Sequence, residues 1–304
     1  MKTVFLEHKN IDKKIWDNTI DKAYNGIIYA YSWYLDIVSP QWNAVITEDY
    51  NTLMPLPAKK KYGIDYIIQP MFMQQGGVFS TQIINENNLR EFINEIPEKY
   101  KYIVLNFNVF INDKNALFKH NGITMHLDLV KAYENIYEGY NSNTKRNIKE
   151  SEKHELKFHK NIDADTLIKL FRKSKAKDLK QIKDFHFDIL QKLINESKSR
   201  NMGNIYGVSD KNDKILAAAF LTYSNNKHIN IFNASSKEGY DKKAMFFLFD
   251  RYFSANSGKV ITFDFEGSSI PGIARFYKGF GAKTVNFPIL RSNKLPLFIR
   301  IFKK

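Results

Sequence analysis

The sequence predicts an α/β protein of two tandem units, each with a mixed central sheet flanked by helices. Two observations indicate this class. The same order of elements, a three-strand meander, a helix and a further strand, occurs twice along the chain. Matching points lie at nearly equal offsets, since Asn51 and Asn212 are 161 residues apart and Leu105 and Phe263 are 158 apart. With 304 residues, the chain also exceeds the usual size of one core.

The first copy is read from residues 42–70, where apolar runs alternate with turn residues at 49–51 and 60–63. These turns divide the segment into three strands. A helical pattern follows at 87–100, and the run YIVLNFN at 102–108 is typical of a buried strand.

The second copy starts at residues 204–235, which are divided into three strands by turns at 210–213 and 225–227. A helix is expected at 241–256. The alternation in VITFDFE, residues 260–266, then predicts a strand.

Three helices are expected between the two copies. Ser142 or Asn143 can cap a helix that runs to about His154. Amphipathic patterns at 164–179 and 184–201 predict two more, and both carry many basic residues. We therefore place the domain boundary near residue 140. The expected domains are 1–140, joined by the C-terminal tail 288–304, and 141–287.

The charge is divided unequally between the two halves of the chain. Residues 1–144 hold 14 basic and 16 acidic residues, whereas residues 145–304 hold 32 basic and 16 acidic residues. This asymmetry favours a polyanionic partner such as nucleic acid, a diphosphate substrate or an anionic membrane surface. The alternative is a solvated, lysine-rich surface without a partner.

Several classes of function are excluded by composition. The chain has no cysteine, which removes thiol nucleophiles and thiolate zinc sites, and its seven histidines have no paired ligand spacing. We therefore expect no metal site. No apolar run reaches the roughly 18 residues of a membrane span, and the start MKTVFLEHKN lacks the apolar core of a signal peptide. We expect a cytoplasmic protein.

Polar side chains gather in the segment ITFDFEGSSIPGIARFYKGFGAK, residues 261–283. Asp264 and Glu266 come at the carboxyl end of a strand, where α/β proteins bind ligands. The following helix carries Arg275, Tyr277 and Lys278. The segment is a candidate site. The structural alternatives are a helix cap or an ion pair with Arg275 for the carboxylates, and ring packing for Tyr277.

The order of elements together with ARFYKGFGA resembles the second half of a GNAT (acyl-CoA N-acyltransferase) domain. In that family the tyrosine matching Tyr277 often protonates the leaving thiolate. The whole chain resembles the FemABX-type subfamily, in which two GNAT-like domains occur in tandem. The motifs that carry this resemblance are KRNIK at 145–149, DFEG at 264–267 and RFYKGFGA at 275–282. The segment with Trp33 and QQGGVFS is similar to uncharacterised bacterial members.

The chain departs from both family patterns at one point each. Acetyl-CoA enzymes usually have a glycine-rich turn that binds the pyrophosphate, whereas SSKEGYDKKA here contains only Gly239, so we expect weak CoA binding. FemABX proteins typically have Phe-Lys in the last motif, where this chain has Phe276, Tyr277 and only then Lys278. A shift of one residue turns a helical side chain by about 100°.

The resemblance implies an acyltransferase that moves an aminoacyl or acyl group to an amine, such as that of a peptidoglycan or other cell-envelope precursor. The implied donor is aminoacyl-tRNA or acyl-CoA, used as a co-substrate with no bound cofactor. The implied partners are a phosphate-bearing acceptor and tRNA. The tail LPLFIRIFKK, residues 295–304, alternates apolar and basic groups, which favours packing against the N-terminal domain, with contact to an anionic membrane surface as the alternative. Two alternatives stay open, an acyl-CoA-dependent N-acyltransferase acting on a small amine or amino sugar, and a non-catalytic binding protein. The expected catalytic residues are Tyr277, Lys278, Asp264 and Glu266, and the expected substrate-binding residues are Arg146, Lys145, Arg275, Ser268, Gln75 and Trp33.

Overall fold

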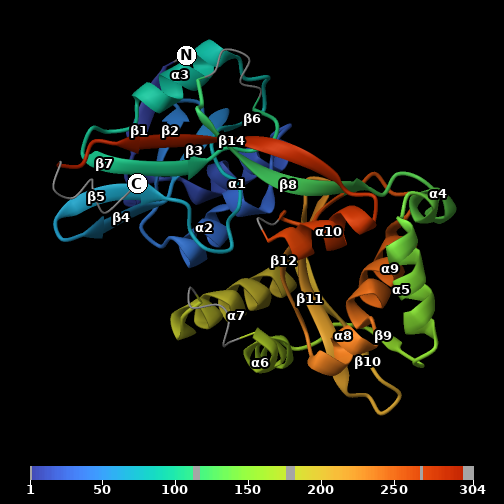
Figure 1. Cartoon of the computed structure of the whole chain (residues 1–304). Helices are drawn as coiled ribbons and strands as arrows, with labels where there is room; N and C mark the ends of the chain where they lie inside the picture. The colour runs from blue at the N-terminus through green and yellow to red at the C-terminus, as the bar shows by residue number, and fades with distance from the viewer. Residues whose placement is uncertain (1, 112–116, 176–181, 268–269, 297–304) are drawn as a thin grey trace. The chain divides into compact units, whose positions relative to one another are not determined.

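The computed structural model describes residues 2–111, 117–175, 182–267 and 270–296. The chain forms two compact units, one of residues 1–122 with 286–304 and one of residues 123–285. Figure 1 shows the course of the chain through the elements of each unit. The mixed α/β class expected from the sequence is confirmed.

The first unit contains two groups of strands. An antiparallel sheet has the order β1-β2-β3-β6, and a second group has the order β4-β5-β7-β14. In the second group β5 and β7 are parallel, and β7 and β14 are antiparallel. The strands are β1 (Thr3–Leu6), β2 (Asn43–Thr47), β3 (Thr52–Leu56), β4 (Ala58–Lys61), β5 (Ile64–Ile68), β6 (Phe79–Ser80), β7 (Tyr100–Asn106) and β14 (Lys283–Asn293).

Within the described residues of this unit, five helical elements join these strands. They are η1 (His8–Asn10), α1 (Lys13–Lys22), η2 (Ile28–Ala30), α2 (Ser32–Val38) and α3 (Glu86–Asn94). The side chain of Asp12 caps α1, and Asn85 with Asn88 forms a capping box at the start of α3. The core of this unit includes the buried rings of Phe92 and Phe107.

The second unit contains one sheet with the strand order β8-β13-β12-β11-β10-β9. Only the β12–β13 pair in this group is parallel among the described pairs. The strands are β8 (His120–Asp128), β9 (Lys157–Lys160), β10 (Gly203–Ser209), β11 (Ile215–Ser224), β12 (Lys227–Ser235) and β13 (Thr262–Asp264). The helices are α4 (Tyr133–Glu138), α5 (Ser142–Glu152), α6 (Ala164–Lys175), α7 (Asp184–Ser199), α8 (Lys237–Asp241), α9 (Ala244–Asn256) and α10 (Pro271–Gly279).

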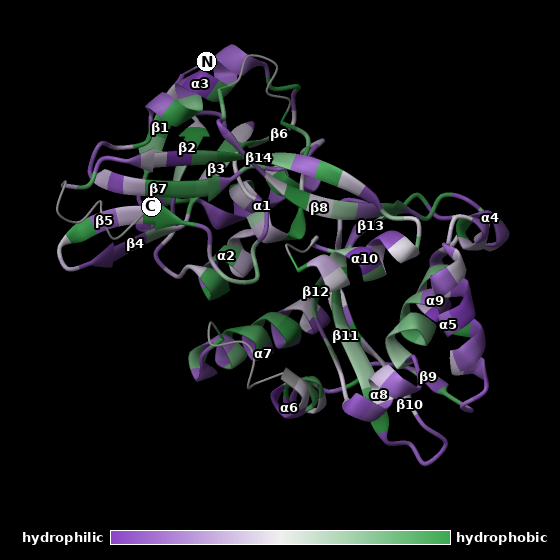
Figure 2. Ribbon diagram, viewed as in Figure 1, coloured by the Kyte–Doolittle hydropathy of each residue, from purple (hydrophilic) through white to green (hydrophobic). Residues whose placement is uncertain are grey.

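Helices cover both faces of the second sheet. The helices α6 and α7 lie against one face, and α8, α9 and α10 lie on the other (Figure 1). The central strand β11 is therefore apolar from residue 215 to residue 221 (Figure 2). Residues 216–221 are fully buried. By contrast, α5 is hydrophilic over much of its surface (Figure 2).

The structure differs from the sequence expectation at several element boundaries. The second strand expected within residues 42–70 is divided into β3 and β4, which belong to different sheets, and the helix expected at 87–100 ends at Asn94. Residues 123–128 of β8 belong to the second unit because β8 pairs with β13, while the domain boundary near residue 140 stays a prediction. The helix expected at 241–256 begins only at Ala244 as α9, since Lys243 adopts a left-handed conformation with φ 57°, and Asp241 is the last residue of α8. The strand expected at 260–266 is shortened to β13, because the backbone turns at Glu266. The helix expected at 164–179 extends in part beyond the described residues.

Candidate active site

A β-bulge in β12 sets the direction of its polar side chains. Leu221 of β11 pairs with Asn230, and Phe220 pairs with Phe232, so Ile231 is an extra residue without a partner. An extra residue reverses the alternation of side chains after it. Asn233 therefore lies on the same face as Asn230, while Phe232 packs against Phe171 of α6 on the other face, with ring centroids 4.7 Å apart.

Both asparagine amides are directed to the hydroxyl of Tyr277 on α10. The Nδ2 atom of Asn230 lies 3.5 Å from the hydroxyl oxygen, and the side chain of Asn233 also forms a hydrogen bond to it. Tyr277 is only 6% exposed. Burial and the negative charge of Glu266 raise its pKa to about 12, against the lowering effect of the Asn233 hydrogen bond. At neutral pH the hydroxyl therefore keeps its proton.

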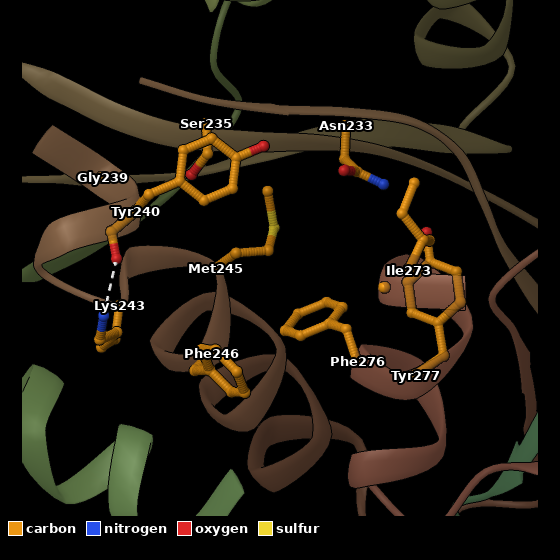
Figure 3. A pocket seen from close by; sticks show the side chains of 11 residues that line it. Asn233, Ser235, Gly239, Tyr240, Lys243, Met245, Phe246, Ile273, Phe276 and Tyr277 are labelled. Atoms are coloured by element: carbon orange, nitrogen blue, oxygen red, sulfur yellow. Dashed lines mark hydrogen bonds between the residues drawn. The ribbon is translucent and has the colours of Figure 1, made fainter. Parts of the chain in front are cut away.

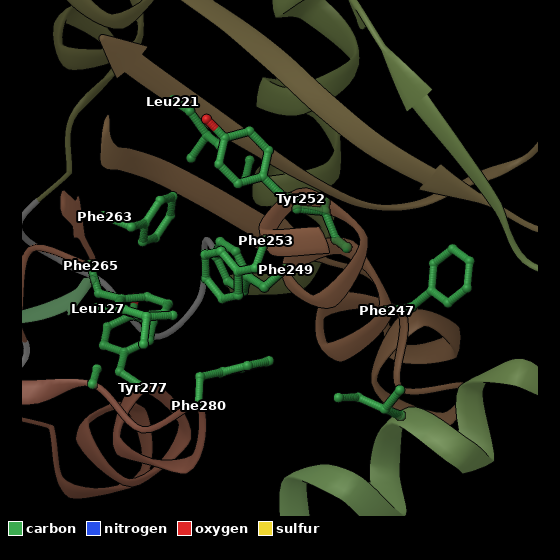
Figure 4. Packing of buried hydrophobic residues seen from close by; sticks show 14 of the residues in the cluster. Leu127, Leu221, Phe247, Phe249, Tyr252, Phe253, Phe263, Phe265, Tyr277 and Phe280 are labelled. Atoms are coloured by element: carbon green, nitrogen blue, oxygen red, sulfur yellow. The ribbon is translucent and has the colours of Figure 1, made fainter. Parts of the chain in front are cut away.

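The ring of Tyr277 is held by an aromatic cluster (Figure 4). It stacks on Phe265 with ring centroids 4.6 Å apart, and Phe265 in turn contacts Phe249, Phe253 and Phe280. Such contacts fix the plane of the ring and hence the place of its hydroxyl. The motif RFYKGFGA thus includes two of the aromatic side chains of this core.

Gly279 in the same motif allows α10 to approach α5. A Cβ atom on Gly279 would lie 2.3 Å from the Oγ1 atom of Thr144. Pro271 starts α10 at a position where a missing N–H costs nothing. Pro271, which precedes the motif, and Gly279 within it thus fix the two ends of the helix that carries Tyr277.

A pocket of about 260 Å³ adjoins the Tyr277 side chain. Figure 3 shows Asn233 and Ser235 of β12 on one side of it, and Phe246 and Phe276 on the other. The walls are largely apolar, and the polar groups come mainly from β12 and Tyr277. The lining residues are Asn233, Ser235, Gly239, Tyr240, Lys243, Met245, Phe246, Gly272, Ile273, Phe276 and Tyr277.

Ser235 supplies a buried polar group to this pocket. Its side chain is 3% exposed, and its Oγ atom has no hydrogen-bond partner among the described residues. An unsatisfied buried hydroxyl costs about 1–3 kcal/mol. In a native protein such a group is expected to bind a ligand or to have another functional role.

Four amides of the turn between β12 and α9 are bonded within the turn itself. The Gly239 N–H donates to Ser236 Oγ at 3.0 Å, and the Tyr240 N–H donates to Ser236 O at 2.9 Å. The N–H groups of Lys242 and Lys243 donate to carbonyl oxygens within the same turn. Glu238 also pairs with Lys214 and Lys242, each at 2.8 Å. A pyrophosphate would have to displace these bonds.

Asp264 lies in a buried hydrogen-bonded cluster at the pairing of β13 with β8. It is fully buried and accepts hydrogen bonds from the Thr124 hydroxyl and from the Glu266 N–H at 2.8 Å, and His126 Nε2 lies 3.1 Å away. Burial opposes ionisation of Asp264, but His126, Thr124 and the charge of Lys227 outweigh it and hold its pKa below the ordinary value. Asp264 is therefore an anion that fastens β13 to β8.

Glu266 has a different setting from Asp264. It is partly exposed and follows the end of β13. Its φ is 56°, a left-handed conformation that is uncommon for glutamate. At the adjacent Gly267 a Cβ atom would lie 2.5 Å from the Ile123 carbonyl oxygen. Strain of this kind gathers at functional sites, and the charge of Glu266 acts on Tyr277.

The other predicted residues lie apart from this pocket. Arg275 and Lys278 are exposed on α10, as the turn of a helix requires when Tyr277 faces inward. Lys145 Nζ donates to the Glu138 carbonyl at 3.0 Å, and Arg146 donates to Asn143 at 2.7 Å.

Three further predicted residues have no described place in the second unit. Gln75 and Trp33 are buried in the first unit, where Gln75 Oε1 accepts from the Val109 N–H at 3.2 Å. Ser268 lies outside the described residues. Of the residues predicted from the sequence, Tyr277 lines the pocket, and Glu266 acts on it through its charge.

The sequence interpretation missed Asn230, Asn233 and Ser235. A usable pattern was present, since two asparagines three residues apart interrupt the apolar strand INIFNAS. Polar residues on one face of a regular strand are separated by two, so a spacing of three indicates a bulge.

The described residues contain neither a metal-binding group of side chains nor a helix that could span a membrane. No group of three or more His, Asp or Glu side chains within them is arranged to hold a metal ion. None of the helices in the described ranges is long and apolar enough to cross a bilayer.

No family model and no curated protein matches this sequence. Solved structures do match over nearly the full chain. FemX matches with a TM-score of 0.71 and 14% identity, over 99% of this chain and 100% of that chain. The C-terminal domain of a putative lysylphosphatidylglycerol synthetase from Agrobacterium fabrum matches with a TM-score of 0.56 and 10% identity, over 93% and 92%. L-PGS from Bacillus licheniformis has a TM-score of 0.56 and 12% identity, over 96% and 95%. The chain therefore has the FemABX-like GNAT fold, as the sequence resemblance predicted.

Proposed function

We propose that this protein is an acyltransferase that moves an aminoacyl group from an activated ester to an amine acceptor. The observation that carries this proposal is the Tyr277 hydroxyl, which is held by two asparagine amides beside an apolar pocket. Acyl transfer to an amine requires a proton donor for the leaving group and a proton acceptor for the amine. The second unit has a group suited to each task.

The reaction proceeds by attack of the amine nitrogen on the acyl carbonyl carbon. The C–N bond forms, the carbonyl oxygen becomes an oxyanion, and the tetrahedral intermediate then breaks the bond to the leaving oxygen. Tyr277 donates its proton to that oxygen, since its raised pKa keeps it protonated at neutral pH. Glu266 accepts the proton that the amine loses. One proton enters and one leaves, and proton transfer from Glu266 to Tyr277 through solvent restores the starting state.

Asp264 acts in this proposal as a positioning residue. It is fully buried, and its oxygens are occupied by Thr124, His126 and the Glu266 N–H. The last of these bonds fixes the backbone of Glu266. Asp264 therefore orients the proton acceptor without contacting the substrate.

The internally bonded turn favours an aminoacyl ester of tRNA over acyl-CoA as donor. Four amides of this turn already donate to Ser236, Glu238 and Tyr240. The excess positive charge of residues 145–304 provides the attraction for a polyanion. One protein with this fold is named for lysylphosphatidylglycerol, a product that joins an aminoacyl group to a phosphate-bearing lipid.

The acceptor in this proposal is an amine on a phosphate-bearing precursor of the cell envelope. Arg146 is exposed near the start of α5, and a guanidinium binds phosphate in a fork geometry. Its one described side-chain bond, to Asn143, is a local contact that an anion can replace.

The second candidate is an acyl-CoA-dependent N-acyltransferase acting on a small amine or amino sugar. The apolar walls of the pocket favour it, because an acyl chain would be desolvated there. The third candidate, a non-catalytic binding protein, predicts ligand binding without turnover.

Formation of a labelled amide product tests these candidates. The protein is incubated with tRNA charged with a mixture of labelled amino acids or, separately, with acyl-CoA. Phosphate-bearing amines, including amino-sugar nucleotides, serve as acceptors. We expect labelled amide product from charged tRNA only. Product from acyl-CoA alone would establish the second candidate, and the absence of product from both donors would contradict catalysis.

A further inference from the structure

We infer that the pocket beside Tyr277 holds the side chain of the transferred group and selects an uncharged, apolar one. This inference deepens the proposed function and rests on it. It names a class of donor that the acyltransferase fold does not specify.

Apolar side chains form most of the pocket walls. Met245, Phe246, Ile273 and Phe276 supply apolar side chains from α9 and α10. Figure 3 shows Met245 extending between the β12 side of the pocket and Phe276. Methionine adapts its shape to a bound group because it is unbranched. The pocket therefore offers an apolar surface to aliphatic side chains of different shapes.

The charges around the pocket disfavour a cationic side chain. Among the described residues that line the pocket there is no aspartate or glutamate, and their one formal charge is the ammonium group of Lys243. That group donates to the Tyr240 carbonyl at 3.3 Å. A lysyl or arginyl side chain would lose its hydration without gaining a counter-ion, and it would meet a like charge. Cationic donors are thus disfavoured.

One side of the pocket carries polar groups. Ser235 Oγ is buried and has no hydrogen-bond partner among the described residues, and it lies on the same side as Asn233. A serine hydroxyl both donates and accepts, so it can bond an α-amino group or a carbonyl. Those groups are common to all aminoacyl donors. Ser235 therefore fixes the shared part of the donor, while the apolar walls distinguish its side chain.

The pocket opens to solvent along an apolar rim. Tyr240 lines the pocket and is nevertheless 51% exposed. An aromatic ring that is half exposed at the mouth of a pocket provides apolar surface for an entering ligand. The walls and the rim of the pocket thus both favour an apolar ligand.

The test compares two small probes that differ only in charge. Norleucinamide and lysinamide have side chains with the same four carbons, and lysinamide adds a terminal ammonium group. Binding to the full chain is measured by NMR titration with labelled methionine methyl groups. We expect norleucinamide to bind at least tenfold more tightly. Equal or tighter binding of lysinamide overturns the inference, as does the absence of binding by both probes.

A charge placed in the pocket provides the matched variant. Met245→Glu supplies the missing counter-ion, so we expect the preference to reverse in favour of lysinamide. Val260→Glu adds the same charge at a side chain that is exposed and does not line the pocket, so the preference should not change. Where Met245→Glu does not fold, as judged by circular dichroism, Ile273→Glu replaces it. An unchanged preference in the folded variant overturns the inference.

Ser235→Ala tests the polar anchor. We expect it to weaken both probes by the same factor of about fivefold, because a net hydrogen bond contributes roughly 1 kcal/mol. Weakening of only one probe overturns the assignment of Ser235 to the shared part of the donor.

The inference and the proposed function fail in different ways. If norleucinamide is preferred but no donor yields amide product, the proposed function fails and the selectivity of the pocket stands. If product forms equally from lysyl and leucyl donors, the function stands and the inference fails.

Discussion

Asn230 on β12 lies with its Nδ2 atom 3.5 Å from the hydroxyl oxygen of Tyr277 on α10, and the bulge at Ile231 lets Asn233 reach the same hydroxyl. Removing either amide should therefore reduce transfer without unfolding the protein. We expect Asn230→Ala and Asn233→Ala each to lower kcat about tenfold, which corresponds to about 1.4 kcal/mol. The measurement is steady-state transfer with the donor found above.

Asn87→Ala is the matched control for these two variants. Asn87 is exposed on α3 in the first unit, so its loss should leave kcat unchanged. Equal kcat in all three variants would show that the amides do not support Tyr277.

Asp264→Asn should destabilise the second unit by about 2–4 kcal/mol. The substitution removes a buried anion that is bonded by Thr124 and His126 and attracted by Lys227. Glu266→Gln should cost about 1 kcal/mol or less, since Glu266 is partly exposed. Urea unfolding at pH 7 measures both. Similar costs would mean that the buried cluster contributes little.

The contribution of Asp264 should depend on pH in a defined direction. Its pKa is lowered in the folded state, so it binds fewer protons there than in the unfolded chain. The resulting stability is present above the unfolded pKa of about 3.9 and is lost as pH falls through the folded value. The difference in unfolding free energy between wild type and Asp264→Asn should therefore shrink below about pH 4. A difference that grows on acidification would contradict the assignment.

Gly279→Ala should destabilise the protein by about 1–3 kcal/mol, because the added methyl group would lie 2.3 Å from Thr144 Oγ1. Gly272→Ala in the same helix is the control, since a Cβ atom there meets nothing within 4 Å. Thermal unfolding measures each variant. The double variant Gly279→Ala with Thr144→Ala should recover part of the loss, and no recovery would mean that another contact sets the cost.

Binding of tRNA should weaken steeply with salt and depend on the basic residues of the second half of the chain. We expect Arg146→Glu to weaken binding at least threefold more than Lys14→Glu, since both side chains are exposed but Lys14 lies in the half without excess positive charge. Filter binding at several salt concentrations measures this. Equal effects would favour a solvated lysine-rich surface.

The sequence predicted the elements around Tyr277 more completely than their contacts. The pattern from Ile261 to Lys283 indicated a strand, a break and a helix, and the structure has β13 and α10 there. Periodicity and turn residues are local properties, so they can be read from a single segment.

The bulge in β12 and the setting of Asp264 depend on distant partners. Asn233 shares the face of Asn230 and reaches Tyr277 only because Ile231 has no partner on β11, and Asp264 is buried by residues of β8 that are far away in the sequence. The left-handed Lys243 likewise depends on how α8 and α9 pack. Pairing between strands and packing of helices are set by the whole fold, so no local pattern specifies them.

The most direct test of the central claim is the transfer rate of Tyr277→Phe. The substitution removes one hydroxyl and keeps the ring that stacks on Phe265. We predict that kcat falls at least 100-fold, as expected for the loss of a general acid, while the unfolding free energy changes by about 1 kcal/mol or less. Transfer by Tyr277→Phe at the wild-type rate would show that the hydroxyl is not the proton donor and would contradict the proposed active site.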